Sequence, residues 1–198
     1  MVDPKVIAGA VTVTVSSTAV ATIVSSTTPT VEGSNTVPVT NVSSTFVGTI
    51  LVQGRAASGT TTVTAQAAGF ADGTMTVTAT PSGFTLINLG NFTTTTTGAN
   101  ATLQITPARL NPSTLNFELN QAIRGGFTIS VPVTAVDQSG SGVGVITVSP
   151  LAFTANQSAQ ITAFDPVNVG TSLISVGVPS GFATPSNFRQ ITATVTAP

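Results

Sequence analysis

Apolar and hydroxyl residues alternate with a period of two along much of this chain, and this pattern limits the folds open to it. Residues 11–15 read VTVTV, and similar runs recur along the whole sequence. Successive side chains of a β-strand point to opposite faces of a sheet, so this period indicates strands with one buried face. No window of eleven or more residues has the apolar spacing of an amphipathic helix. Further strands are predicted at residues 61–65, 74–80, 103–105, 115–119, 127–135, 146–148, 173–176 and 191–196.

The composition also favours an all-β fold. The chain holds 38 Thr and 19 Ser, and Thr, Val and Ile are stiff side chains that suit a pleated sheet. Gly, Pro, Asn and Ser separate the predicted strands at intervals of about 8–12 residues, which is typical of a sandwich or a barrel. Residues 117–124 (FELNQAIR) have the most helical character, but Gly125 and Gly126 follow them. We predict a strand and then a turn there.

The near-absence of charge excludes several classes of function. The 198 residues include five basic and six acidic side chains, a net charge of -1, and no Cys or His. Structural zinc sites, haem ligation by His, Cys nucleophiles and Ser-His-Asp triads are therefore impossible. Five dispersed basic residues cannot form a patch for nucleic acid, and no apolar run approaches the ~20 residues of a membrane span. The chain is predicted to be neither an enzyme nor a cofactor or metal protein, with no nucleic-acid partner.

An internal repeat divides the chain into two similar parts. Residues 59–80 align with residues 170–197. Both segments open with Gly-Thr, pass through a strand to Gly-Phe, and close on an alternating Thr strand. Two homologous β units are therefore predicted. The upstream correspondences are residues 11–23 with 131–146, and residues 29–41 with 150–164.

The two copies differ at their beginnings. The first starts almost directly at its equivalent of residues 127–131, whereas the second has an extra strand at 115–119. We therefore expect the chain to be part of a longer repeat protein. Between the copies, residues 92–97 and 101–106 flank a three-residue loop, which predicts a β-hairpin.

Residues 13–23, 59–70 and 74–80 resemble the bacterial immunoglobulin-like (Big-type) repeats, which carry strings such as VTVSSSNPAVATV and GTTTVTA. The resemblance implies seven-stranded Greek-key sandwiches in tandem, as in surface adhesins, stalks and accessory modules of extracellular enzymes, with no catalytic residue to carry over. The expected fold is all-β, with two tandem immunoglobulin-like Greek-key β-sandwiches joined by a β-hairpin connector. The expected domains are a sandwich at 1–82 (complete or without its first strand), a connector at 83–112 and a sandwich at 113–198.

Candidate catalytic and metal sites are weak. A glycosidase needs two carboxylates about 5–9 Å apart across a cleft, and nothing in the spacing pairs the carboxylates here. Residues 137–142 (DQSGSG) offer oxygen ligands for Ca²⁺ but only one carboxylate, and a plain Gly/Ser loop explains them equally well. Residues 140–144 fit a tight turn better than a phosphate loop. Lys5 is the only lysine, which argues against Lys–Asn isopeptide bonds. The carboxylates are Asp3, Glu32, Asp72, Glu118, Asp137 and Asp165.

Four Asn-x-Ser/Thr sequons are candidate glycosylation sites if the chain is exported. In a sequence this rich in Ser and Thr, several such sequons also arise by chance. Residues 93–97, five consecutive threonines, could carry O-linked sugars or pack in a sheet. The sequon residues are Asn41, Asn91, Asn100 and Asn156.

The scarcity of charge bears on function directly. A surface with few charges promotes association, and sheet edges are normally protected by Lys, Pro or inward charges. Pro38, Pro132 and Pro179 lie in predicted strands and are expected at edges or bulges. The first hypothesis is an extracellular or cell-surface stalk or filament of tandem modules. Its partners would be other copies of itself or other surface proteins, with β-strand complementation between subunits in the filament form. The second is an adhesion or ligand-binding module, although a glycan site usually needs the Trp or Tyr that this chain lacks.

Overall fold

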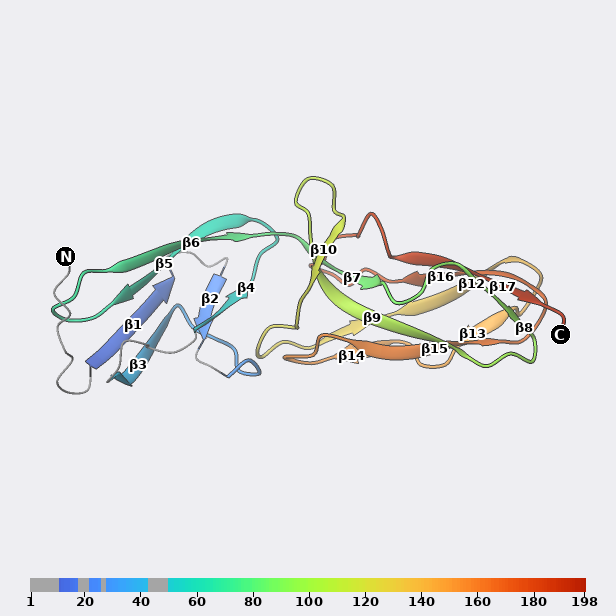
Figure 1. The fold of residues 1–198 in the computed structure, drawn as a ribbon, viewed down its shortest axis with the longest axis horizontal. Helices are drawn as coiled ribbons and strands as arrows, with labels where there is room; N and C mark the ends of the chain where they lie inside the picture. Colours follow the sequence, from blue (N-terminus) through green and yellow to red (C-terminus); the bar gives the residue numbers. More distant parts are fainter. Residues whose placement is uncertain (1–10, 18–21, 26–27, 43–49) are drawn as a thin grey trace. The chain divides into compact units, whose positions relative to one another are not determined.

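The chain is folded entirely from β-strands over the residues that the structure describes. The computed structural model describes residues 11–17, 22–25, 28–42 and 50–198 (Figure 1). All the regular secondary structure in these ranges is β-strand, which confirms the predicted all-β class. The chain divides into two compact units. Unit 1 comprises Met1–Ala79 and the segment Arg124–Gly126, and unit 2 comprises Thr80–Ile123 and Phe127–Pro198.

Unit 2 is a β-sandwich. One of its sheets has the strand order β10-β9-β15-β13, with β7 also paired to β9, and another has the order β12-β16-β17-β8. The pair β11-β14 forms a short separate ladder. The strands are β7 (Ser82–Leu86), β8 (Phe92–Thr95), β9 (Ala101–Leu110), β10 (Phe117–Asn120), β11 (Ile129–Val131), β12 (Val133–Ser139), β13 (Gly144–Ile146), β14 (Leu151–Phe153), β15 (Gln160–Pro166), β16 (Gly170–Val176) and β17 (Gln190–Thr196).

The connectivity of unit 2 is that of an immunoglobulin-like Greek key. If β7, β9, β12, β13, β15, β16 and β17 are lettered A to G in chain order, one sheet holds A, B, E and D and the other holds C, F and G. This is the strand distribution of immunoglobulin constant-type sandwiches. Strand β8 joins the second sheet by pairing with β17 in parallel (Figure 1). The predicted sandwich fold is therefore present in unit 2.

The core of unit 2 follows the alternation read from the sequence. On β16, Ser172, Ile174 and Val176 are buried and the residues between them are not, and β17 shows the same period. Phe84, Phe153 and Phe164 are the largest fully buried side chains. The ring centroids of Phe84 and Phe153 are 5.2 Å apart, and the rings are tilted against each other, an arrangement typical of aromatic pairs. The apolar faces of the two sheets thus pack against each other.

The predicted hairpin between residues 92–97 and 101–106 does not form. Strand β8 pairs with β17, whereas β9 pairs with β7, β10 and β15 of the other sheet. The loop at residues 98–100 therefore passes from one sheet to the other. The physical reason is the partial burial of Phe92 against the core, where its ring centroid lies 6.0 Å from that of Phe164. Residues 83–112 accordingly contribute strands to unit 2 and are not a separate connector.

The described residues of unit 1 form one four-stranded sheet and one two-stranded sheet. The four-stranded sheet has the order β3-β1-β5-β6, and β2 pairs with β4. Among the described residues of unit 1, Val63 is the buried apolar residue, and Val37, Val52, Ala65 and Val77 pack against it. The strands are β1 (Val11–Ser17), β2 (Thr22–Ser25), β3 (Thr36–Val42), β4 (Leu51–Gly54), β5 (Gly59–Gln66) and β6 (Gly73–Ala79).

The two units share the part of the fold that their sequences share. In unit 1, β1 pairs with β5, which pairs with β6; in unit 2, β12 pairs with β16, which pairs with β17. Strand β3 departs from this correspondence. It pairs with β1, whereas β15, its counterpart by sequence, pairs with β9 and β13. Within the described ranges of unit 1 no strand corresponds to β9, so β3 has a different neighbour.

The three prolines predicted at edges or bulges behave differently from one another. Pro38 lies on β3, which is an edge strand of its sheet. Pro132 separates β11, which pairs with β14, from β12, which pairs with β16. Pro179 lies beyond the end of β16, so its placement in a strand was wrong. The stretch 117–124 forms β10 and then a loop, as predicted.

Candidate functional site

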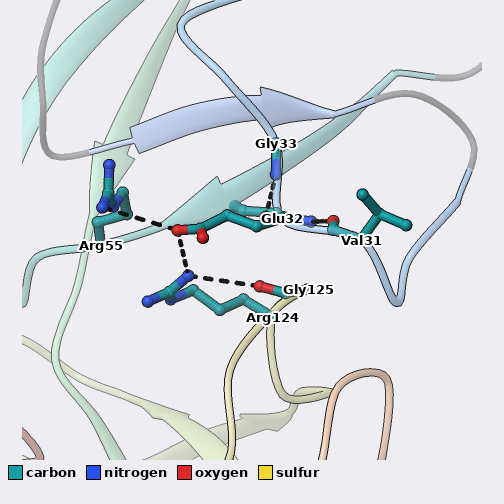
Figure 2. Close-up of polar contacts among 7 residues, drawn as sticks. Val31, Glu32, Gly33, Arg55, Arg124 and Gly125 are labelled. Atoms are coloured by element: carbon teal, nitrogen blue, oxygen red, sulfur yellow. Dashed lines mark hydrogen bonds and ion pairs between the residues drawn. The ribbon is translucent and has the colours of Figure 1, made fainter.

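The densest group of charged side chains in the described part of the chain is centred on Glu32 of unit 1 (Figure 2). Its Oε1 accepts a hydrogen bond from Nη1 of Arg124 at 3.0 Å and lies 3.6 Å from Nη2 of Arg55. Nη1 of Arg124 also donates to the carbonyl oxygen of Gly125. All three charged side chains are partly exposed to solvent, which screens their attraction. The cluster is a surface ion-pair network.

The backbone on both sides of Glu32 is held by one buried amide. Gln53 donates through Nε2 to the carbonyl oxygen of Val31 at 2.9 Å, and its Oε1 accepts the N–H of Gly33 at 3.1 Å. A Cβ on Gly125 would lie only 1.9 Å from the Val31 oxygen, so no larger residue fits this close approach. Glu32 is therefore positioned by main-chain contacts. Sequence reasoning missed this cluster, because Glu32 and Arg124 are 92 positions apart.

The other carboxylates that make hydrogen bonds also hold local structure. Glu118 on β10 accepts from Nε of Arg109 at 3.0 Å and from Nδ2 of Asn111 at 2.9 Å. Asp72, in the turn between β5 and β6, accepts from Nε2 of Gln66 at 2.7 Å. Asp165 lies on β15 opposite Val145. Asp3 lies outside the described residues, and among those described no three Asp or Glu side chains form a group able to hold a metal.

The loop considered for calcium is closed by its own hydrogen bonds. The two carboxylate oxygens of Asp137 accept the N–H groups of Gly142 at 2.7 Å and Val143 at 3.3 Å. Nδ2 of Asn168 donates to the carbonyl oxygens of Ser141 and Gly142, each at 3.1 Å. Gly142 has a φ of 61°, a conformation that favours glycine. The arrangement fits the interpretation of this segment as a plain Gly/Ser loop.

The four sequons lie in different environments. Asn41 is on β3, and its side chain is outside the described part of the structure. Asn91 is exposed, but its Oδ1 accepts the N–H of Thr192 at 2.8 Å. Asn100 is exposed in the loop that precedes β9. Asn156 is exposed with a φ of 68°, and its N–H donates to the carbonyl oxygen of Ile123.

Unit 2 also has an exposed aromatic surface that the sequence did not reveal. Phe117 and Phe188 form an edge-to-face pair with ring centroids 6.0 Å apart, and Phe188 is 47% exposed. Leu119, on the same strand as Phe117, is 53% exposed. We call the pair Phe117 and Phe188 the Phe117–Phe188 surface. Residues of this size are costly to leave in water and often mark interaction sites.

Two loops joined by hydrogen bonds hold the Phe117–Phe188 surface in place. The N–H of Phe117 donates to Oδ1 of Asn187 at 2.8 Å, and the N–H of Ser186 donates to the carbonyl oxygen of Leu115 at 3.0 Å. Leu115 and Phe188 have φ values of 57° and 56°, a strained region for bulky residues. No sequence signal other than the two phenylalanines could have revealed this pairing.

The described part of the chain contains no apolar helix of membrane-spanning length.

Comparison with known proteins gives distant structural likenesses. No protein-family model and no curated protein matches the sequence. Domains 4 and 5 of the S-layer protein SbsC are similar with a TM-score of 0.38 and 17% identity, over 90% of this chain and 72% of that one. Invasin, a bacterial integrin-binding protein, has a TM-score of 0.35 and 15% identity, over 96% of this chain and 33% of invasin. The D0-D1 domain of intimin has a TM-score of 0.32 and 14% identity, over 98% and 83%. At these TM-scores the likenesses carry no inference about this chain.

Proposed function

We propose that the chain is a non-catalytic structural segment of an extracellular or cell-surface protein, in which tandem immunoglobulin-like modules form a stalk or filament. The observation that carries the proposal is the role of the carboxylates. Glu32, Asp72, Glu118 and Asp137 each accept hydrogen bonds that hold a loop or strand in place. A general acid or base would instead need to reach a substrate. These carboxylates therefore have structural roles, and the chain has no Cys or His.

In the filament form of the proposal, neighbouring subunits complete each other's sheets. The described strands of unit 1 include counterparts of β12, β16 and β17 but none of β7 or β9, which supply the first two strands of the unit 2 sandwich. A strand from a neighbouring molecule would supply main-chain hydrogen bonds to unit 1. The partners are then other copies of the chain or other surface proteins.

An adhesion module is the second candidate function, and the Phe117–Phe188 surface favours it. Aromatic side chains in rigid surroundings are common anchors of protein interfaces. A protein partner suits this surface better than a glycan, because carbohydrate sites usually stack sugars on Trp or Tyr, which the chain lacks. Binding to a glycan panel would favour a sugar partner, and saturable binding to a surface protein would favour adhesion over a purely structural role.

Glycosylation of the exported chain is a further part of the proposal. Asn100 is the sequon residue we expect to be modified first, because it is exposed in a loop and none of the side-chain hydrogen bonds among the described residues involves it. Asn91 is restrained through Thr192, so we expect less modification there. Peptide mapping by mass spectrometry of native material would measure the occupancy of both.

Electron microscopy of the native material, or of the chain concentrated at neutral pH, tests the filament form. A regular fibre with an axial repeat of about 30–40 Å, the length of a sandwich with strands of roughly ten residues, is the expected result. Dispersed particles at every concentration would reject the filament and leave a monomeric stalk or an adhesion module. Sedimentation of the same samples would separate ordered fibres from amorphous aggregates.

A further inference from the structure

The β5-β6 hairpin of unit 1 is built in the same register as the β16-β17 hairpin of unit 2. Gly59 lies opposite Ala79 in the first, and Gly170 lies opposite Val195 in the second. Counting along each ladder from these pairs, Val77 corresponds to Ala193 and Met75 corresponds to Ile191. The two hairpins can therefore be compared residue by residue.

In unit 2 the far side of this hairpin is covered by β8. Strand β8 pairs in parallel with β17 from Phe92 opposite Ala193 to Thr95 opposite Thr196. The Phe92 side chain lies on the core side, where it packs against Phe164. Hydrogen bonds extend the pairing at either end. The N–H of Thr192 donates to Oδ1 of Asn91, and the N–H of Thr96 donates to the carbonyl oxygen of Thr196. β17 is thus an interior strand.

In unit 1 the equivalent side of β6 has no strand paired to it within the described ranges. The sheet order β3-β1-β5-β6 ends at β6. Burial differs accordingly: Ile191, Ala193 and Val195 are 5%, 0% and 1% exposed, whereas Met75 is 55% exposed although it lies on the core side opposite Val63. Val77 and Ala79 are only half-buried.

Strand β6 also lacks the features that usually protect an edge. Its sequence, GTMTVTA, has no charged residue and no proline. Its pairing with β5 runs without a bulge from Gly59 opposite Ala79 to Ala65 opposite Gly73. Exposed edges without Lys, Pro or bulges readily accept another strand.

We propose that the outer edge of β6, to which no described strand is paired, is an acceptor for an extended, uncharged segment with the alternation of β8, bound parallel to β6. The apolar residue of that segment would lie beside Val77 on the core side, as Phe92 lies beside Ala193. Main-chain hydrogen bonds would supply affinity and the apolar residue would supply register. This inference rests on the strand-complementation form of the proposed function, and it names the acceptor edge and the chemistry of the donor.

A fluorescent peptide with the sequence of residues 90–98 (GNFTTTTTG) tests the inference on the full chain, with anisotropy as the readout. Saturable binding is expected. Replacing the peptide phenylalanine by alanine should weaken binding by about thirtyfold, the loss typical of a truncated aromatic anchor. Thr76→Lys, on β6, should abolish binding because a lysine opposes strand addition at an edge. Thr64→Lys, on the same face of the interior strand β5, is the matched control and should bind as the parent does.

Disulfide trapping tests the register, since the chain has no Cys of its own. A peptide with Cys in place of its phenylalanine should cross-link to Val77→Cys and not to Thr78→Cys, which lies on the opposite face. Circular dichroism of each variant verifies that it is folded.

Three outcomes would overturn the inference: absence of binding by the parent chain, equal loss in both lysine variants, or cross-linking at residue 78. Fibres without peptide binding would reject only this inference. Peptide binding without fibres would support it and reject the filament.

Discussion

Thr85 and Thr106 face each other across β7 and β9, with their hydroxyl oxygens 3.1 Å apart and both side chains buried. A second contact joins the Thr85 hydroxyl to the carbonyl oxygen of Thr106 at 3.4 Å. The pair satisfies two hydroxyls inside the sheet that contains the first two strands of unit 2. Removing one partner takes the side-chain hydrogen bond from the other buried hydroxyl, which keeps only a long contact to a carbonyl oxygen, whereas removing both leaves no hydroxyl to satisfy.

We therefore expect Thr85→Val and Thr106→Val each to lower the free energy of unfolding of unit 2 by about 1 kcal/mol. The double variant should lose less than the sum of the two. The chain lacks Trp and Tyr, so calorimetry and far-ultraviolet circular dichroism are the suitable measurements. Strictly additive losses would show that the two hydroxyls do not interact.

Ser172 is expected to be a site where a smaller side chain stabilises the protein. Its hydroxyl is fully buried on β16, and within the described part of the chain it has no hydrogen-bond partner. Ser172→Ala should raise the free energy of unfolding by about 1 kcal/mol, because an unsatisfied buried hydroxyl is removed.

Ser175→Ala on the same strand is the control for Ser172. Its hydroxyl accepts a hydrogen bond from Nε2 of Gln190, so its removal should be neutral or slightly destabilising in a calorimetric melt. A lower melting temperature for Ser172→Ala than for the parent would contradict the assignment.

Asp137 is expected to stabilise unit 2 without calcium. Asp137→Ala removes the acceptor of two N–H groups and should cost about 1–2 kcal/mol, as the loss of a helix cap does. Adding Ca²⁺ or a chelator should leave the melting temperature of the parent unchanged. A rise with Ca²⁺ concentration would show that the folded loop binds the ion.

Gly125 and Glu32 are expected to differ in their effects on unit 1. Gly125→Ala forces a Cβ against the Val31 carbonyl oxygen and should break the neighbouring hydrogen bond from Gly126 N–H to the Thr30 oxygen. Glu32→Gln removes only screened ion pairs and should cost about 0–1 kcal/mol. Amide hydrogen exchange at Gly126 reports the difference: it should accelerate strongly in the first variant and little in the second. Equal exchange in both variants would contradict the close approach at Gly125.

Local alternation predicted much of the fold. The runs at residues 61–65, 74–80, 173–176 and 191–196 fall on β5, β6, β16 and β17, because a period of two needs only neighbouring side chains to be read. The hairpin expected between 92–97 and 101–106 was wrong for the complementary reason. A turn signal describes the chain locally, and burial of Phe92 against Phe164 decided which sheet β8 joined.

The all-β class, many of the strands, the internal repeat and the exclusion of Cys and His chemistry could all be read from the amino-acid order, since each depends on residue identity or short-range period. Which side chains meet could be read only from the folded chain. Glu32 and Arg124 are 92 positions apart, and no local pattern relates them. Likewise, only comparison with β17, which β8 covers, showed that no described strand pairs with the outer edge of β6. Which distant segments pair as strands depends on the side chains that are buried together, and the local period of the sequence does not contain that information.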